Sequence, residues 1–87
     1  MSKQAVQQAI ARLKTEINAL DVSQAGVKKR VSALVRDLER QLEHADEVDH
    51  GPMIERLTDA VDLFEAEHPT ITGILNGIAT SLSNMGI

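Results

Sequence analysis

The fold depends on the segment LDVSQAG at residues 20–26. On both sides of it, apolar residues recur every three or four positions, which is the spacing of an amphipathic helix with one apolar face. Asp21 and Gln24 have the spacing of a capping box, in which two side chains satisfy the free backbone N–H groups at a helix start, and Ser23 is an alternative capping residue. The segment therefore predicts a tight turn between two antiparallel helices, at residues 3–20 and 23–45.

The same segment permits a second interpretation. The apolar seam continues in phase from Leu20 to Val27 and Val31, and no proline interrupts it, although Gln24 within it is polar. One continuous helix from about residue 3 to 45 is the alternative. Such a long helix would need a partner helix along its whole apolar seam.

Two prolines mark the helices of the second half of the chain. Pro52 follows a glycine and is expected at the first position of a third helix, at residues 52–67. Pro69 disfavours a helical conformation at the residue before it, so this helix must end near His68. A fourth helix is then expected at residues 69–85, with His68 capping or packing at the break.

Composition limits the class of protein. The chain has 87 residues, 43% of them hydrophobic, with no cysteine and with Phe64 as its single aromatic residue. This length and hydrophobic content are typical of one globular domain, and the helical spacing makes that domain all-α. We therefore expect a single helical domain, residues 1–87, folded as a small bundle of about four helices. Without cysteine the chain holds neither a disulfide nor a cysteine-based zinc site.

The chain resembles a family of short bacterial proteins. The residues that carry the resemblance are Phe64-Glu65, His68-Pro69 and the closing LSNMGI at residues 82–87. The family is catalogued as domain of unknown function 4404, and its members are similar in length and run to a terminal Met-Gly-Ile. The resemblance implies a bacterial helical protein. It supplies neither an activity nor known site residues.

Charge is unevenly distributed along the chain. Residues 1–40 hold eight basic and four acidic residues, whereas residues 41–87 hold nine acidic residues and Arg56 as their single basic one. The two halves can attract each other, within one chain or between two chains, and so fix how the helices are oriented. The alternative is two solvated faces of opposite sign, whose ion pairs add little stability.

Nucleic-acid binding and catalysis find little support in the sequence. Lys29, Arg36 and Arg40 share one helical face, but acidic residues interrupt that surface and the net charge is −4. The chain has no phosphate loop, nucleophile elbow or zinc-protease motif. Four short helices also leave little room for a dry active-site pocket. We therefore expect neither an enzyme nor a cofactor, and no nucleic acid as a partner.

Histidines and carboxylates could form a metal site in one place. His44 and His50 flank the acidic residues of an expected loop at 45–52, and such groups together can bind a metal ion. No His-x-x-x-His spacing is present, and we favour a solvated acidic loop without metal. The acidic residues concerned are Asp46, Glu47 and Asp49.

The most unusual segment is residues 69–87, which contain no charged residue. As a helix it has a complete apolar face and an opposite face of small and polar residues. Gly73 and Gly77 lie four apart on the second face, where a neighbouring helix can approach closely, although each glycine costs about 1 kcal/mol relative to alanine. Because a solvated face gains nothing from that cost, we predict that a helix of this chain or of a second copy covers it. This surface, called the glycine face below, consists of Gly73, Gly77, Thr80, Ser81 and Asn84.

These observations predict a non-catalytic interaction or scaffold protein that self-associates as a homodimer. With no apolar leader and no run of 18 apolar residues, we expect it in the cytoplasm. The alternative function is a peripheral membrane-surface protein that uses its uncharged terminal helix. No Lys or Arg flanks that helix, however, and anionic lipid would repel the acidic residues before it. An ordinary buried helix in a monomer is the remaining alternative.

The last residues have the pattern of a Schellman cap, with Met85 as the C-cap, Gly86 left-handed and Ile87 packed over Leu82. Gly86→Ala should lower the free energy of unfolding by about 1 kcal/mol, because the left-handed conformation is unfavourable for a residue with a Cβ atom. Deleting Ile87 should cost at least as much through lost burial. Thermal unfolding followed by circular dichroism measures both effects. A melting temperature that survives removal of both residues would show that the end is frayed.

Overall fold

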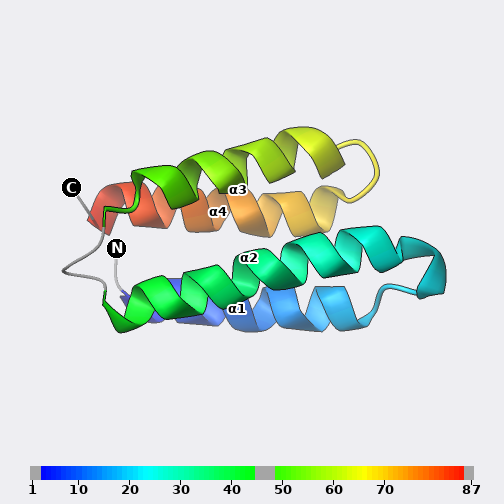
Figure 1. The fold of residues 1–87 in the computed structure, drawn as a ribbon, viewed down its shortest axis with the longest axis horizontal. Coiled ribbons are helices and arrows are strands. Elements are labelled where there is room, and N and C mark those ends of the chain that lie inside the picture. Colours follow the sequence, from blue (N-terminus) through cyan, green and yellow to red (C-terminus); the bar gives the residue numbers. More distant parts are fainter. Residues whose placement is uncertain (1–2, 45–48, 86–87) are drawn as a thin grey trace.

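The computed structural model describes residues 3–44 and 49–85. Within these ranges the expected all-α bundle with an N-terminal hairpin is confirmed. Figure 1 shows two antiparallel hairpins side by side, α1–α2 and α3–α4. The helices are α1 (Lys3–Asn18), α2 (Ala25–Glu43), α3 (Gly51–Phe64) and α4 (Pro69–Met85), with a short 3₁₀ helix, η1 (Val22–Gln24), before α2.

The segment at residues 20–26 forms a turn, so the alternative of one helix from residue 3 to 45 is wrong. α1 ends at Asn18, two residues earlier than predicted. The N–H of Ala19 is shared between two carbonyl groups of the last turn, each at 3.2 Å, which is common where a helix ends. The chain then reverses, and α2 packs back along α1.

Asp21 caps this turn, although not through the predicted capping box. Its carboxylate accepts a hydrogen bond from the backbone N–H of Ser23 at 3.0 Å, which starts η1, and a second one from the Ser23 hydroxyl. The side chain of Gln24 makes no capping hydrogen bond. Because η1 occupies the intervening residues, α2 begins at Ala25 rather than at residue 23.

α3 begins one residue earlier than predicted. Gly51 rather than Pro52 is its first residue, and His50 precedes it as the N-cap. The carboxylate of Asp49 accepts a hydrogen bond from the N–H of Gly51 at 2.9 Å, which satisfies one of the free donors at the helix start. Of the expected loop at 45–52, residues 45–48 lie outside the described part of the chain.

The break between α3 and α4 lies where Pro69 places it. α3 ends at Phe64, three residues before its predicted end, and α4 begins at Pro69 as predicted. The N–H of His68 donates to the carbonyl of Phe64 at 2.9 Å, and the carbonyl of His68 accepts from the N–H of Thr72 at 3.0 Å. The His68 ring also packs edge-on against Phe64, with ring centroids 6.3 Å apart. His68 therefore packs at the break, as expected.

The core is one aliphatic cluster to which each of the α-helices contributes. The apolar seams of α1 and α2 are buried as their spacing predicted, apart from the partly buried Leu20 and Val27, and so is the apolar face of α4. A fully buried side chain of this kind stabilises the fold by roughly 1.5–3 kcal/mol. The buried hydrophobic residues are Val6, Ile10, Leu13, Ile17, Val31, Leu34, Val35, Leu38, Leu42, Met53, Leu57, Ala60, Ile71, Ile74, Leu75, Ile78, Ala79 and Leu82.

α4 has the most central position in the bundle. It packs on both α1 and α3, whereas α2 packs mainly on α1 and contacts α3 less extensively. In Figure 1, α1 and α4 lie behind α2 and α3, so that α2 and α3 form one broad front face. This face spans the two larger dimensions of a molecule that measures 38 × 20 × 17 Å. Within residues 3–44 and 49–85, none of the helices combines the length and the apolar character needed to cross a membrane.

The turn between α1 and α2 gives a direct test of the role of Asp21. Asp21→Ala should lower the free energy of unfolding by about 1 kcal/mol, because the N–H of Ser23 loses its acceptor. Asp21→Asn is the matched control, since it keeps a side-chain oxygen at the same position. Urea unfolding followed by far-UV circular dichroism measures the difference. Equal stability of the alanine variant and the wild type would mean that this cap contributes nothing.

Candidate functional site

The predicted glycine face lies on the outer side of α4, away from the core. Gly73, Gly77, Thr80 and Asn84 are exposed, and Ser81 is half-buried. A Cβ atom built on either glycine would meet nothing within 4 Å, so no other described part of the chain covers these positions. The alternative that another helix of the same chain covers the glycine face is therefore wrong. That a second copy covers it stays a prediction.

The outer surface of α4 is uncharged along the whole helix. It presents small and polar side chains, whereas the exposed sides of α1, α2 and α3 all carry charged residues. The Thr80 hydroxyl donates back to the carbonyl of Asn76 in its own helix at 3.0 Å. The exposed residues of α4 are Pro69, Thr70, Gly73, Asn76, Gly77, Thr80, Ser83 and Asn84.

The predicted C-terminal cap is only partly within the described chain. Leu82, the residue on which the cap was expected to pack, is fully buried. The side chain of Met85, together with Gly86 and Ile87, lies outside the described residues. The cap therefore stays a prediction.

His50 departs from the expected solvated loop, because its side chain is only 1% exposed. Its Nδ1 lies 3.0 Å from Oε1 of Gln41, and this hydrogen bond joins the N-cap of α3 to α2. His44, by contrast, is exposed at the end of α2. The described residues contain no group of three His, Asp or Glu side chains that could hold a metal ion. Asp46 and Glu47 lie outside them.

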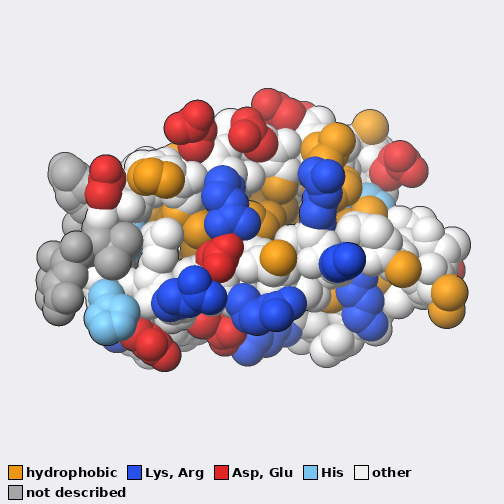
Figure 2. Space-filling model, in the orientation of Figure 1, with side chains coloured by type: hydrophobic (Ala, Val, Ile, Leu, Met, Phe, Trp, Pro, Cys, Tyr) orange, Lys and Arg blue, Asp and Glu red, His pale blue; other side chains and the backbone are white. Residues whose placement is uncertain are grey.

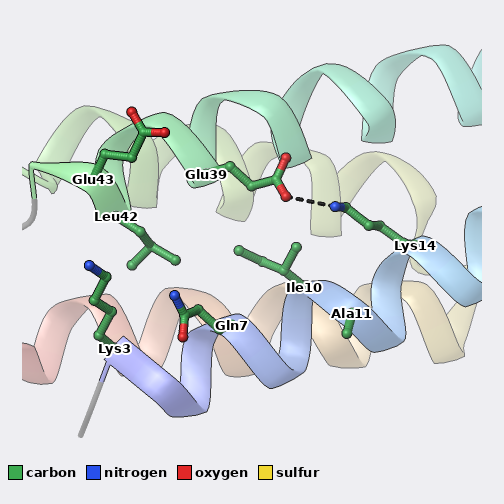
Figure 3. Close-up of a pocket in the computed structure, with 8 residues that line it drawn as sticks. All are labelled: Lys3, Gln7, Ile10, Ala11, Lys14, Glu39, Leu42 and Glu43. Carbon is green, nitrogen blue, oxygen red and sulfur yellow. Dashed lines mark hydrogen bonds and ion pairs between the residues drawn. The ribbon is translucent and has the colours of Figure 1, made fainter.

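A hollow of about 430 Å³ lies between α1 and α2 (Figure 3). Ile10 and Leu42 point toward each other within it, and an ion pair between Lys14 and Glu39, 2.6 Å long, crosses it. Both ion-paired side chains are about half exposed. Catalysis requires groups that are fixed in a dry environment, and exposed flexible side chains do not provide one. This hollow is therefore a weak candidate for an active site.

A second hollow, of about 390 Å³, lies between α2 and α3 on the front face. Leu63 lines it and is 57% exposed. It lies roughly 100° around α3 from the centre of the buried side of that helix, which Met53, Leu57 and Ala60 form. Figure 2 shows hydrophobic side chains between basic residues over α2 and acidic residues over α3.

The ion pairs of the described residues do not follow the uneven distribution of charge between the two halves of the chain. Among the described residues, the pair that joins the two halves of the chain is Arg56 of α3 with Asp37 of α2. Its cation therefore comes from the acidic half and its anion from the basic half. The Arg40–Asp37 pair lies within the basic half, as the Lys14–Glu39 pair does. The attraction predicted between the halves is thus not used within the described part of the protomer.

The comparisons with known proteins identify the family. The family model described as Domain of unknown function (DUF4404) matches residues 6–87. The chain belongs to this family. The match includes nearly all of α1 and the whole of α2, α3 and α4, so the expected membership is confirmed. No curated protein and no solved structure gave a significant match to this DUF4404 chain.

The link between α2 and α3 in this DUF4404 protein gives a second stability test. Gln41→Leu should lower the free energy of unfolding by about 1–3 kcal/mol, because it leaves the buried Nδ1 of His50 without its partner. Gln8→Leu is the matched control, since Gln8 lies on the exposed side of α1. Urea unfolding measures both variants. If they lose the same amount of stability, the hydrogen bond to His50 has no net effect.

Proposed function

We propose that this protein is a non-catalytic, cytoplasmic interaction or scaffold protein that self-associates as a homodimer through the glycine face of α4. The observation that carries the proposal is the uncharged outer surface of a 17-residue helix. Surface helices that face water normally carry charged residues on their polar side. A surface without charge loses little when a second helix displaces its water.

The glycines add a geometric reason. Gly73 and Gly77 are both exposed, and open space lies over each of them. Glycine weakens a helix but removes the side chain that keeps two backbones apart. Thr80 and Asn84, which are exposed further along the same face, can form hydrogen bonds to a second helix. The face thus combines close approach with polar groups that fix the relative position of two copies.

Burial of the apolar face of α4 favours a protein partner over a membrane surface. Ile74, Leu75 and Ile78 pack in the core, where they hold α4 against α1 and α3. A membrane-surface helix inserts its apolar face between lipids, so α4 would have to leave the bundle to act in that way. The acidic residues of the adjacent α3 would also be repelled by anionic lipid.

Gly77→Leu tests the proposed interface. A leucine side chain would fill the space that a second helix needs, so the substitution should raise the Kd of this contact at least tenfold, equivalent to about 1.4 kcal/mol. Helix content should hold or rise, because leucine is the better helix former. Sedimentation equilibrium with interference optics measures the Kd, since the chain has no Trp or Tyr for absorbance detection.

Gly26→Leu is the matched control for this experiment. Gly26 is also exposed, with open space where a Cβ atom would lie, but it belongs to the first turn of α2. Gly26→Leu should leave the contact through the glycine face unchanged. A wild-type protein that is monomeric at about 1 mM would refute self-association, and binding of monomeric protein to liposomes would favour the membrane alternative. Equal Kd values for the wild type and Gly77→Leu would exclude the glycine face as the interface.

A further inference from the structure

We infer that the hollow between α2 and α3 is a second self-association surface, on which another copy of this chain packs about a two-fold axis that runs along the hollow. The inference rests on the self-association proposed above, but it does not depend on the glycine face. It concerns the front face of the molecule, whereas α4 lies behind α3 (Figure 1).

The hollow has the composition of the centre of a protein contact. Ala33, Leu34 and Ala60 line it, and the exposed Leu63 stands beside them. The small alanine side chains let another helix come close. Among the described residues, Leu63 and Val22 are the large hydrophobic side chains that are exposed, and only Leu63 adjoins an apolar hollow. Apolar surface of this kind, rimmed by charged residues, is typical of protein interaction sites.

The charges on the two sides of the hollow have opposite signs and run in opposite order along it. Asp37 of α2 and Arg56 of α3 form an ion pair, which marks one level. Arg30 comes two turns before Asp37, and Asp59 comes one turn after Arg56. Because α2 and α3 run in opposite directions, Arg30 and Asp59 lie on the same side of that pair, and both line the hollow. At the ion pair the anion belongs to α2 and the cation to α3. Further along the hollow the cation, Arg30, belongs to α2 and the anion, Asp59, to α3.

A two-fold axis along the hollow requires this arrangement of charges. Such an axis places α3 of one copy on α2 of the other and keeps every residue at its own level along the hollow. Asp37 then meets Arg56 of the second copy, and the long side chain of Arg30 reaches toward Asp59 of the second copy across about 6 Å along the hollow. The two Leu63 side chains come together near the axis.

The groups that this contact needs are available in the protomer. Arg30 and Asp59 are exposed, and neither forms an ion pair with another described residue. The front face spans 38 × 20 Å, and a standard interface takes roughly 800 Å² from each partner, so the contact must cover nearly the whole of this face. Since the glycine face belongs to α4, both contacts can form at once, and pairs joined through one surface can be linked through the other.

Exchange of charges tests the inference in the full chain. In a Gly77→Leu background, Arg30→Asp and Asp59→Arg should each raise the Kd of the remaining association at least tenfold, because like charges then meet twice in each homodimer. An equimolar mixture of the two variants restores opposite charges at both positions. It should form 1:1 heterodimers with the Kd of the Gly77→Leu parent. Sedimentation equilibrium gives the Kd, and native mass spectrometry distinguishes heterodimers from homodimers.

Two further variants separate the hollow from a general effect of surface hydrophobicity. Leu63→Gln should weaken the association at least tenfold, whereas Val22→Gln, at an exposed residue of η1, should leave it unchanged. Circular dichroism shows that each variant is folded. A Gly77→Leu protein that is monomeric at about 1 mM would overturn the inference, and so would charge variants that do not complement each other. If Gly77→Leu has no effect while the charge variants dissociate the protein and complement each other, the glycine face fails and the hollow stands.

Discussion

The packing of α4 against both α1 and α3 connects the N-terminal hairpin to the C-terminal hairpin. Ile71, Leu75 and Ile78 of α4 lie in the shared core, which is aliphatic apart from the partly buried Phe64. Because the chain contains no disulfide, burial of these side chains supplies most of what opposes the conformational entropy of the unfolded chain. α2 is held chiefly through α1, with the Arg56–Asp37 ion pair and the His50–Gln41 hydrogen bond as its polar links to α3.

Two open surfaces follow from this central position of α4. Its apolar face is used inside the bundle, so the face that remains outside is the uncharged one with Gly73 and Gly77. The weaker contact between α2 and α3 leaves the front of the bundle hollow, with Leu63 partly in solvent. A small domain buries a limited share of its surface, and association is a common way to bury more. Both surfaces therefore remain exposed because a bundle of this length has too few residues to cover all sides of its helices.

The sequence predicted the local structure better than the contacts between distant helices. The apolar spacing identified the four helices and most of the core, since periodicity determines which side of a helix is buried. The turn at residues 20–26 predicted that α2 packs on α1, but periodicity could not show that α2 contacts α3 less extensively, because it does not identify neighbours that are distant in the sequence. The buried state of His50 was missed for the same reason, since its partner Gln41 belongs to another helix. The glycine face was predicted from Gly73 and Gly77 directly, and the structure adds that no described part of the chain covers them.

The placement of the helix ends gives the bundle two unlike poles. The first turn of α1 and the last turn of α4 lie at one pole, and the tight turns after α1 and α3 lie at the other (Figure 1). Rotation about an axis along the hollow does not exchange the poles, so two copies joined there have the first turn of α1 and the last turn of α4 of each copy at the same pole. A protein domain attached before α1 or after α4 would therefore connect to the bundle at that pole. The opposite pole, formed by the turns, would remain unobstructed in every such assembly.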